Sequence, residues 1–202
     1  MGYYYDSNPE VESKIREIEF EVHNVKMHLK TDNGVFSKNR VDEGSLAFLK
    51  VLLPLKLTGN ILDLGCGYGT IGLTIAKSNS SVRVTLADIN SRALSLCERN
   101  AKELGLSQRV TCLQSDIFEK IEGRYDSIVV NPPIRAGKKV TYAMYEGSKQ
   151  FLIDGGSLFI VIRKAQGALT ACEYIKSIFG NCNLIDRSKG YYIYQAVKQL
   201  SK

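Results

Sequence analysis

From Asn60 onward, short apolar runs alternate with amphipathic segments, and this rhythm constrains the fold more than any other feature of the sequence. Each run is short enough for a buried strand, whereas the segments between the runs repeat apolar residues at helical spacing. Strands connected through helices pair in parallel with right-handed crossovers, so the sequence predicts an α/β fold with a doubly wound sheet. The expected strands are residues 61–64, 82–87, 110–113, 125–130 and 157–162, and the expected helices run from the turn at residues 65–69 through Ala76 and over residues 91–104, 140–153 and 166–179.

The end of the chain departs from this alternation. Strands predicted at residues 182–187 and 191–197 are joined by a tight turn at residues 188–190, so they should pair antiparallel. Another turn is expected at residues 154–156, directly before the strand that starts at Ser157. The full prediction is a seven-stranded, mostly parallel sheet with an antiparallel last strand.

Upstream of the sheet, two alternating runs within residues 16–31 predict an N-terminal β-hairpin, and leucines at helical spacing then predict a helix from Leu46 to Leu53. Hydrophobic residues make up 44% and charged residues 24%, as in an ordinary globular protein. We expect one domain over residues 1–202, with the hairpin as an extension and residues 45–202 as the core. No apolar run approaches the ~18 residues of a membrane helix and no secretory signal is recognisable, which favours the cytoplasm.

A glycine-rich turn, Asp-Leu-Gly-Cys-Gly-Tyr-Gly at residues 63–69, follows the first strand of the predicted sheet. Open α/β sheets bind ligands at the carboxyl ends of their strands, and glycines let a ligand approach bare backbone. The dinucleotide pattern would need glycine at position 70, where Thr70 stands, so an adenosine cofactor without a pyrophosphate fits better. Gly65 and Gly67 are predicted to contact it, and Asp63 either orients the turn or faces a cationic group of the ligand. The alternative is a plain strand–helix connection.

Two more acids stand where the next strands end. Asp88 comes 21 residues after Gly67 (88 − 67), where a carboxylate can accept hydrogen bonds from both ribose hydroxyls. Asp116 follows the third predicted strand and could accept from an adenine amino group. The alternative for both acids is that they cap the segments that follow. We predict Asp88 and Asp116 as cofactor-binding residues.

The fourth predicted strand ends in Asn131-Pro132-Pro133. The Asn131 amide oxygen and the Pro132 carbonyl could jointly accept hydrogen bonds from an exocyclic NH₂ group, and the prolines fix the backbone without an N–H that competes. Beside an adenosine cofactor, this predicts methyl transfer from S-adenosyl-L-methionine to a planar amino nitrogen. Asn131, Pro132 and Pro133 are the predicted catalytic residues, and Asn131 also borders the cofactor. The alternative is that the motif merely ends a strand.

The net charge of +6 suggests a polyanionic partner, and Arg135, Lys138 and Lys139 follow the proposed catalytic motif directly. Such side chains could contact RNA phosphates, and the alternative is a solvated basic loop. The five cysteines are scattered without a Cys-x-x-Cys pair, and the two histidines lack a metal-binding partner. The sequence therefore predicts neither a disulfide framework nor a metal site. It leaves the oligomeric state open, with a monomer among the options.

The glycine turn at residues 63–69 and Asn-Pro-Pro-Ile at residues 131–134 resemble those of the Rossmann-like S-adenosylmethionine methyltransferases. With Gly-Val-Phe-Ser at residues 34–37 and Asn-Pro-Pro-Ile-Arg-Ala-Gly-Lys at residues 131–138, the chain is similar in particular to the small-domain family of ribosomal RNA guanine-N2 methyltransferases. The resemblance runs from about Glu19 to Val197 and implies a single methyltransferase domain. It also implies a methyl-acceptor role for residues 131–133 and cofactor contacts at Gly65, Gly67, Asp88 and Asp116.

One departure from that family concerns the acceptor base. Many relatives carry an aromatic residue after Asn-Pro-Pro, where this chain has Ile134, so stacking must come from Phe36, from Tyr142 or from an apolar wall. The predicted substrate-binding residues are Phe36, Ile134, Arg135, Lys138 and Lys139, and the predicted partner is RNA, ribosomal RNA in particular, with a flipped or single-stranded base. Alternatives are an N-methyltransferase of a protein glutamine or of adenine N6, and a non-catalytic RNA-binding module on the same fold.

Overall fold

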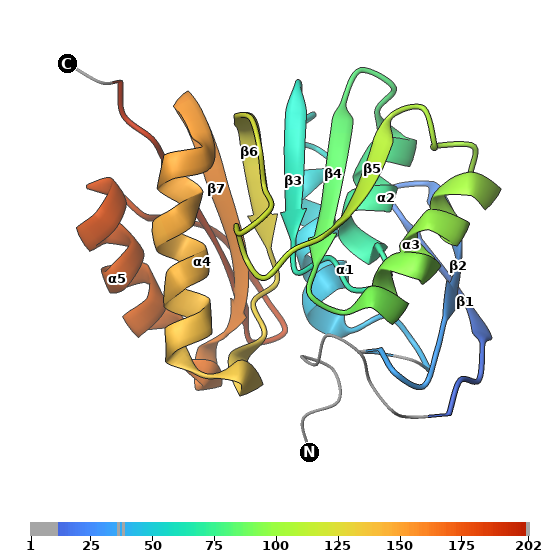
Figure 1. Ribbon diagram of the computed structural model, residues 1–202. Coiled ribbons are helices and arrows are strands. Elements are labelled where there is room, and N and C mark those ends of the chain that lie inside the picture. Colours follow the sequence, from blue (N-terminus) through green and yellow to red (C-terminus); the bar gives the residue numbers. More distant parts are fainter. Residues whose placement is uncertain (1–11, 36, 38, 201–202) are drawn as a thin grey trace.

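The computed structural model describes residues 12–35, 37 and 39–200. Within these residues, one sheet is formed by seven strands, which are β3 (Asn60–Leu64), β4 (Arg83–Asp88), β5 (Val110–Gln114), β6 (Tyr125–Val130), β7 (Leu152–Arg163), β8 (Asn183–Ser188) and β9 (Tyr191–Val197). Their order is β5-β4-β3-β6-β7-β9-β8 (Figure 1). The first five of that order pair in parallel, and β9 is antiparallel to both of its neighbours. The fold predicted from the sequence is confirmed.

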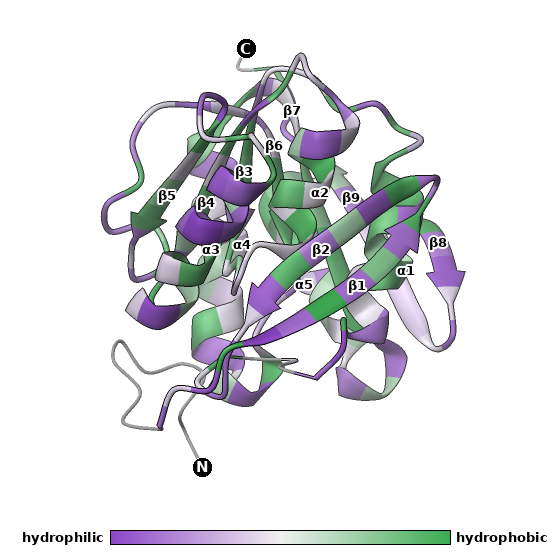
Figure 2. Ribbon diagram, turned by 90° about the vertical axis from the view of Figure 1, so that its right-hand side faces the viewer, coloured by the Kyte–Doolittle hydropathy of each residue, from purple (hydrophilic) through white to green (hydrophobic). Residues whose placement is uncertain are grey.

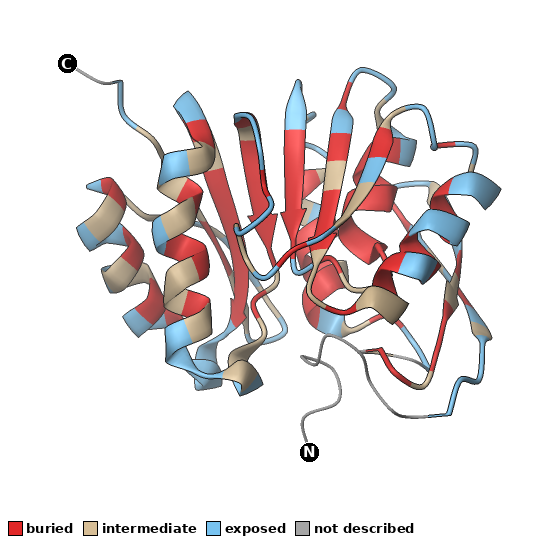
Figure 3. Cartoon of the chain, viewed as in Figure 1, coloured by how far each residue is buried: buried red, intermediate tan, exposed pale blue. Residues whose placement is uncertain are grey.

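Helices cover both faces of the sheet. One face carries α1 (Glu43–Leu52), α2 (Thr70–Ser78) and α3 (Ser91–Glu103), and the other carries α4 (Lys138–Phe151) and α5 (Ala168–Phe179). Residues 158–162 of β7 are all apolar because both faces of the strand are covered: Phe159 and Val161 belong to the first core, and Leu158, Ile160 and Ile162 to the second. Figure 3 shows the central strands buried and the outer surfaces of the helices exposed. Two short 3-10 helices, η2 (Ile134–Ala136) and η3 (Lys164–Gln166), precede α4 and α5.

The predicted hairpin is formed by β1 (Arg16–Val22) and β2 (Val25–Thr31). Its two turn residues, His23 and Asn24, have φ angles of 46° and 63°, the left-handed conformation that tight hairpin turns require. The face of alternate residues Ile18, Val22, Met27 and Leu29 is buried in the core that α1, α2 and α3 share. Figure 2 shows the hairpin lying across this side of the molecule, with hydrophilic and hydrophobic residues alternating along both strands.

The free edge of β2 is closed by a side chain from α3. Asn100 accepts a hydrogen bond from the Lys30 amide at 2.7 Å and donates one to the Lys30 carbonyl at 3.0 Å. The same Asn100 amide donates to the Tyr68 carbonyl in the glycine turn at 3.1 Å. One buried side chain therefore ties the hairpin to the turn that follows β3.

The predicted boundaries around residues 140–157 are wrong in detail. Helix α4 begins at Lys138 and ends at Phe151, and β7 begins at Leu152, five residues before Ser157. The expected turn at residues 154–156 is instead a bulge inside β7, because the register moves from Tyr125↔Leu152 to Ser127↔Ser157. Two backbone hydrogen bonds with Lys198, from the Gly155 amide and to the Gly156 carbonyl, hold the bulge against the chain after β9. The glycines thus bend a strand rather than end one.

None of the helices in the described part of the chain is both long enough and apolar enough to span a membrane.

Candidate active site

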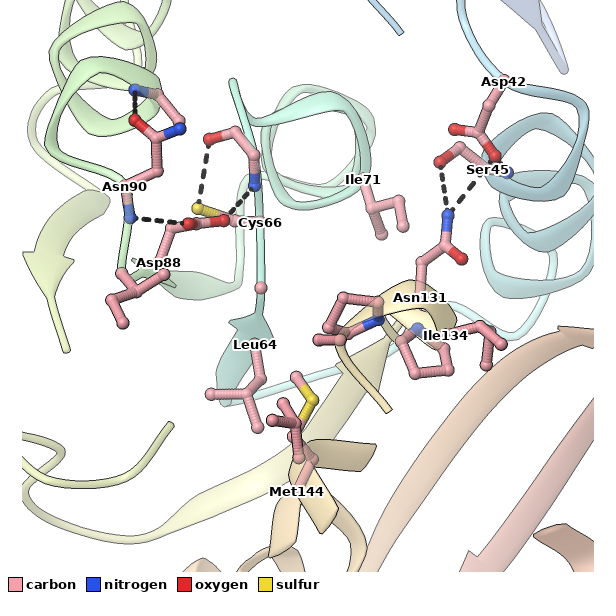
Figure 4. A pocket seen from close by; sticks show the side chains of 18 of the residues that line it. Asp42, Ser45, Leu64, Cys66, Ile71, Asp88, Asn90, Asn131, Ile134 and Met144 are labelled. Atoms are coloured by element: carbon pink, nitrogen blue, oxygen red, sulfur yellow. Dashed lines mark hydrogen bonds between the residues drawn. The ribbon is translucent and has the colours of Figure 1, made fainter. Parts of the chain in front are cut away.

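A cavity of about 350 Å³ opens at the carboxyl ends of the parallel strands. It lies where the strand order reverses, since β4 flanks β3 on one side and β6 flanks it on the other. Figure 4 shows its two halves: Asp88 and Asn90 lie on one side, Asp42, Ser45 and Asn131 on the other, and Leu64 and Met144 between them. Apart from Asp63, the residues predicted from the glycine turn and from Asn-Pro-Pro are therefore brought to one cavity.

The glycine turn forms the floor of the cavity with left-handed backbone at three positions. Gly65, Gly67 and Gly69 have φ angles of 75°, 56° and 96°, a region that residues with a side chain rarely adopt. Gly65 and Gly67 line the cavity, and nothing lies within 4 Å of a Cβ placed on Gly67. A Cβ on Gly69 would instead lie 2.6 Å from Leu73 Cδ1 inside the core. The first two glycines border ligand space, and the third allows close packing.

Asp63 lies beneath this turn, outside the cavity lining. Its side chain is buried, and Oδ2 accepts a hydrogen bond from the Gly72 amide in the first turn of α2 at 2.7 Å. A Cβ on Gly72 would lie 2.2 Å from Leu86 Cδ2, so α2 sits directly against the sheet here. Burial raises the pKa of Asp63 to about 7, the Gly72 hydrogen bond lowers it, and the nearby Asp88 adds a smaller increase. Of the two positions expected for Asp63, the structure has the one that orients the turn.

Asp88 lines the cavity at the end of β4. Its two carboxylate oxygens accept hydrogen bonds from the Gly67 amide at 2.8 Å and from the Asn90 amide at 2.9 Å. Burial raises the pKa of Asp88, and the backbone hydrogen bonds lower it. The capping role that was the alternative for Asp88 belongs to Asn90, whose side chain accepts from the Arg92 and Ala93 amides. Asp88 thus holds the glycine turn and keeps lone pairs toward the cavity.

The rest of this half comes from the ends of β4 and β5. Exposed Asp116 lines the cavity as expected, together with apolar Ile89 and Ile117. Ile117 has a φ of 51°, an unusual conformation for a β-branched residue, and such outliers concentrate at functional sites. Asn90 also donates from Nδ2 to the Gly34 carbonyl at 3.1 Å, which ties the loop after β2 to the cavity. Asn90 was not predicted from the sequence, although an asparagine directly before a helix is a common N-cap.

Asn131, in the other half, has a fixed amide orientation. Its Nδ2 donates to Ser45 Oγ at 3.1 Å and to Asp42 Oδ1 at 3.4 Å (Figure 4). A carboxylate only accepts hydrogen bonds, so the amide nitrogen must face Asp42 and Oδ1 faces away from it. Asp42 is the N-cap of α1 and accepts from the Ser45 amide at 2.9 Å. Asp42 and Ser45 were missed because the predicted helix started at Leu46, although an aspartate directly before a helix is a common N-cap.

The prolines fix the chain directly after Asn131. The Pro132 carbonyl accepts from the Ile134 amide at 2.9 Å in a tight turn. The Pro133 carbonyl accepts from the Ala136 amide at 2.9 Å and the Ile134 carbonyl from the Gly137 amide at 3.2 Å, and these two bonds form η2. The Pro132 oxygen retains its second lone pair for another donor. Pro132, Pro133 and Ile134 all line the cavity.

The predicted substrate-binding residues are not all at the cavity. Arg135 lines it, whereas Lys138 and Lys139 are exposed on the first turn of α4, outside the lining. Phe36 lies outside the described residues. Tyr142, offered as a base-stacking residue, packs against Tyr174 of α5 with ring centroids 3.8 Å apart and is not part of the cavity lining.

A further wall was not foreseen from the sequence. It is formed where β7 ends, η3 follows and β9 begins, with the side chains of Val161, Ile162, Arg163, Gln166 and Tyr191. This wall lies on the far side of the sheet order from Asp88, beyond β6 and Asn131. It adds Arg163, Gln166 and Tyr191 to the polar groups on the side away from the predicted cofactor residues.

Cys66 also lines the cavity, and its Sγ lies 3.8 Å from Cys97 Sγ. Burial raises the pKa of the Cys66 thiol to about 12, so it stays protonated and unreactive near neutral pH. Within residues 12–35, 37 and 39–200, no group of three or more His, Cys, Asp and Glu side chains could hold a metal ion.

Comparison with known proteins places this geometry in context. The family model described as "Methyltransferase small domain" matches residues 26–195. A Bacillus subtilis (strain 168) protein, "Uncharacterized protein YbxB", is 39% identical over 198 residues, which make up 97% of this chain and 98% of that protein. "Ribosomal RNA small subunit methyltransferase C" of Mannheimia succiniciproducens is 34% identical over 168 residues, 81% of this chain and 49% of that protein.

A solved structure with the same fold is the T. thermophilus 16S rRNA N2 G1207 methyltransferase (RsmC) in complex with AdoMet and guanosine. It matches with a TM-score of 0.83 and 25% identity over 95% of this chain and 52% of its own. The chain spans about half the length of the ribosomal RNA methyltransferases that it matches.

Proposed function

This chain belongs to the methyltransferase small-domain family of S-adenosylmethionine-dependent enzymes, and on that premise we propose that it methylates the exocyclic N2 of a guanine in ribosomal RNA. The family membership confirms the resemblance read from residues 63–69 and 131–134. The observation that carries the proposal is the amide oxygen of Asn131, which Asp42 and Ser45 hold in one orientation at the cofactor cavity.

The cofactor half of the cavity fits an adenosine-containing ligand. Gly67 presents bare backbone to open space, Asp88 offers carboxylate lone pairs, and Asp116 adds a second acceptor at the end of β5. Ile89 and Ile117 supply apolar surface for a planar ring system. When bound, S-adenosylmethionine supplies a methyl group on a positively charged sulfur. We assign its contacts to Gly65, Gly67, Asp88 and Asp116, with Asn131 at its reactive end.

The acceptor half would position an amine for in-line attack. Asn131 Oδ1 and the Pro132 carbonyl each accept a hydrogen bond from the NH₂ group, which draws both hydrogens to one side of the nitrogen. The lone pair then points to the other side of the nitrogen and is no longer delocalised into the ring. The rigid Asn-Pro-Pro backbone fixes both acceptors before the substrate arrives, so catalysis rests mainly on positioning. The attacking nitrogen becomes cationic as it takes up the methyl group and then loses a proton.

The surface beside the acceptor half supports a polyanionic substrate. Arg135, Lys138 and Lys139 follow Asn-Pro-Pro, and at the same edge of the sheet Arg163 ends β7 and Lys164 comes directly after it. Among the described residues, none of these five side chains forms an ion pair with an acid. Lysines at the first turn of a helix oppose its dipole, so Lys138 and Lys139 do not serve the stability of α4. Their placement suits contacts to RNA phosphates.

The decisive experiment is transfer of a labelled methyl group from S-adenosylmethionine. RNA from cells that lack this protein, free or in ribosomal subunits, serves as acceptor, and mass spectrometry identifies the modified nucleotide. We expect N2-methylguanosine at one position. Label on adenine N6 or on a protein glutamine would replace the proposed substrate by one of its alternatives.

Asn131→Ala tests the catalytic assignment in the same assay. It removes the amide oxygen, so we expect methyl transfer to fall at least about 100-fold, as for loss of a positioned hydrogen-bonding group in a transition state. Cofactor affinity, measured by calorimetry, should change much less. Gln150→Ala, which removes an exposed amide from α4, is the matched control and should behave as wild type.

A further inference from the structure

The cavity needs a surface for a planar acceptor, and Ile134 does not provide an aromatic one. Tyr142 packs against α5 instead. Among the described residues, two aromatic side chains line the cavity, Tyr68 and Tyr191. Tyr68 is buried in the glycine turn, and its hydroxyl donates to the Ser37 carbonyl, so it belongs to the cofactor half. Tyr191 is half-buried and lies in the wall beyond Asn131.

Tyr191 lies close to Asp42, the residue whose carboxylate contacts the Asn131 amide. A Cβ on Gly44, the second residue of α1, would lie 2.9 Å from Tyr191 Cε1 and 3.0 Å from Asp42 Oδ1. The tyrosine ring therefore rests on the first turn of α1, beside the carboxylate that contacts the Asn131 amide. A glycine at position 44 leaves room for the ring.

Backbone pairing between β7 and β9 fixes the position of Tyr191 in the wall. Tyr191 is the first residue of β9 and pairs with Arg163, the last residue of β7. The Lys164 amide donates to the Gly190 carbonyl at 2.8 Å, which holds the turn before Tyr191 against η3. The Arg163 guanidinium lies 5.7 Å from the centroid of the Tyr191 ring, within the range of a cation–π contact. Arg163 is otherwise exposed, so its remaining N–H groups face solvent and the cavity.

We propose that Tyr191 is the surface on which the acceptor base stacks and that Arg163, held over its ring, contacts a phosphate next to that base. The inference rests on the proposed function and names its substrate class as an unpaired nucleobase with its sugar-phosphate backbone. Unstacked bases are commonly bound on aromatic rings and arginine planes, whereas an aliphatic amide gains little from such a ring. Tyr191 thus takes the place of the aromatic residue that is absent at Ile134.

The neighbouring residue provides an unusually close control. Tyr192 carries its own arginine, with the Arg187 guanidinium 5.9 Å from the ring centroid. It follows Tyr191 on β9, so its side chain points to the opposite face of the sheet, where it packs against the α4 and α5 core. Neither Tyr192 nor Arg187 lines the cavity. The same substitutions at Tyr192 and Arg187 therefore serve as controls away from the site.

Kinetics give the first test. Base–aromatic stacking corresponds to roughly a 5- to 150-fold change in affinity, so Tyr191→Leu should raise the KM for RNA by that factor while calorimetry shows unchanged cofactor affinity. Tyr191→Phe keeps the ring and should recover most of the loss. Arg163→Gln should lower the slope of log K against log salt by about 0.7 to 0.9. Tyr192→Leu and Arg187→Gln should match wild type in all three measurements.

Fluorescence gives a direct reading of stacking that does not depend on turnover. The chain contains no tryptophan, so Tyr191→Trp and Tyr192→Trp each introduce a single indole. A single-stranded RNA that carries the methylated position should quench the first protein and leave the second unchanged. Thermal unfolding of every variant checks that it is folded.

Two failures can be told apart. If wild type methylates RNA while Tyr191→Leu retains its KM and Tyr191→Trp is not quenched, the inference is overturned and the proposed function stands. If wild type methylates no RNA and quenching is absent, the proposed function fails and the inference fails with it.

Discussion

At the scale of single residues, the site depends on groups that hold other groups in place. Asn131 can offer its amide oxygen because Asp42 and Ser45 occupy its nitrogen. Asp88 can face the cavity because Asn90 takes over the capping of α3. The sequence identified Asn131 and Asp88 from their places at strand ends but passed over their partners. Asp42 and Ser45 contact Asn131 only because a helix start and a strand end meet in space, which spacing along the chain does not reveal.

Ser45→Ala tests the orientation of the Asn131 amide. The variant removes one of two acceptors from Nδ2 and keeps the Asp42 cap, so the amide loses part of its restraint while α1 remains formed. A net hydrogen bond of about 0.5–1.5 kcal/mol predicts a roughly 2- to 12-fold lower kcat with cofactor affinity unchanged. Ser95→Ala on the exposed side of α3 is the control. An unaltered kcat would show that Asp42 alone orients the amide.

Asp63→Asn tests the buried carboxyl beneath the glycine turn. Folding raises its pKa from 3.8 to about 7, so between these pH values the folded state binds the proton more tightly than the unfolded state. The free energy of unfolding therefore loses this contribution as pH rises through that window. Asparagine has no such titration and still offers an oxygen to the Gly72 amide.

We expect urea unfolding to show the stability of Asp63→Asn rising relative to wild type by about 1–4 kcal/mol between pH 4 and pH 8. A constant difference across that range would mean that the pKa of Asp63 is not raised in the folded protein.

At the scale of elements, periodicity predicted the type of each strand and helix but not every boundary. Strand β7 is the clearest case. In the sequence, Gly155 and Gly156 indicate a turn, but in the structure their backbone groups form hydrogen bonds with Lys198 and the two residues lie in a bulge. The two-residue hairpin turn at His23 and Asn24 was placed correctly, since alternation on both sides fixes the register. The wall at the end of β7 went unnoticed because Arg163 and Tyr191 are adjacent only through antiparallel pairing.

Asn100→Ala tests the coupling of the hairpin to the glycine turn. The variant leaves the backbone groups of Lys30 and the Tyr68 carbonyl without their partner at a buried position. We expect a loss of about 1–3 kcal/mol in the free energy of unfolding together with weaker cofactor binding. Ser177→Ala, at an exposed site on α5, serves as the control. Lower stability with full cofactor affinity would show that the hairpin supports the fold alone.

At the scale of the whole molecule, charge is divided along one edge of the sheet. The cofactor half carries the acids Asp88 and Asp116, and the acceptor half is bordered by the basic residues at the start of α4 and directly before α4 and α5. The net charge of +6 did not predict this division, because a sum says nothing about location. The topology produces it, since every βα connection on the β6 and β7 side delivers its basic residues to the same edge.

Lys138→Ala combined with Lys139→Ala tests this edge. Removing two phosphate contacts should reduce the slope of log K against log salt by about 1.4 to 1.8 for single-stranded RNA or for duplex, respectively. Lys102→Ala combined with Lys176→Ala removes the same charge from the last turns of α3 and α5, at the opposite edge of the sheet. That control should leave the slope near wild type. Equal slopes for the two double variants would show that Lys138 and Lys139 do not contact RNA phosphates.

The reversed direction of β9 has a consequence for how such an enzyme can change. Its first residue, rather than its last, reaches the edge where the other strands end, so Tyr191 enters the acceptor wall from a tight turn late in the chain. The residues assigned to the donor lie between Gly65 and Asn131 in the sequence, and this wall is encoded from Val161 onward. Replacing the short segment around residues 188–191 should therefore change the acceptor specificity and leave the donor site unaltered.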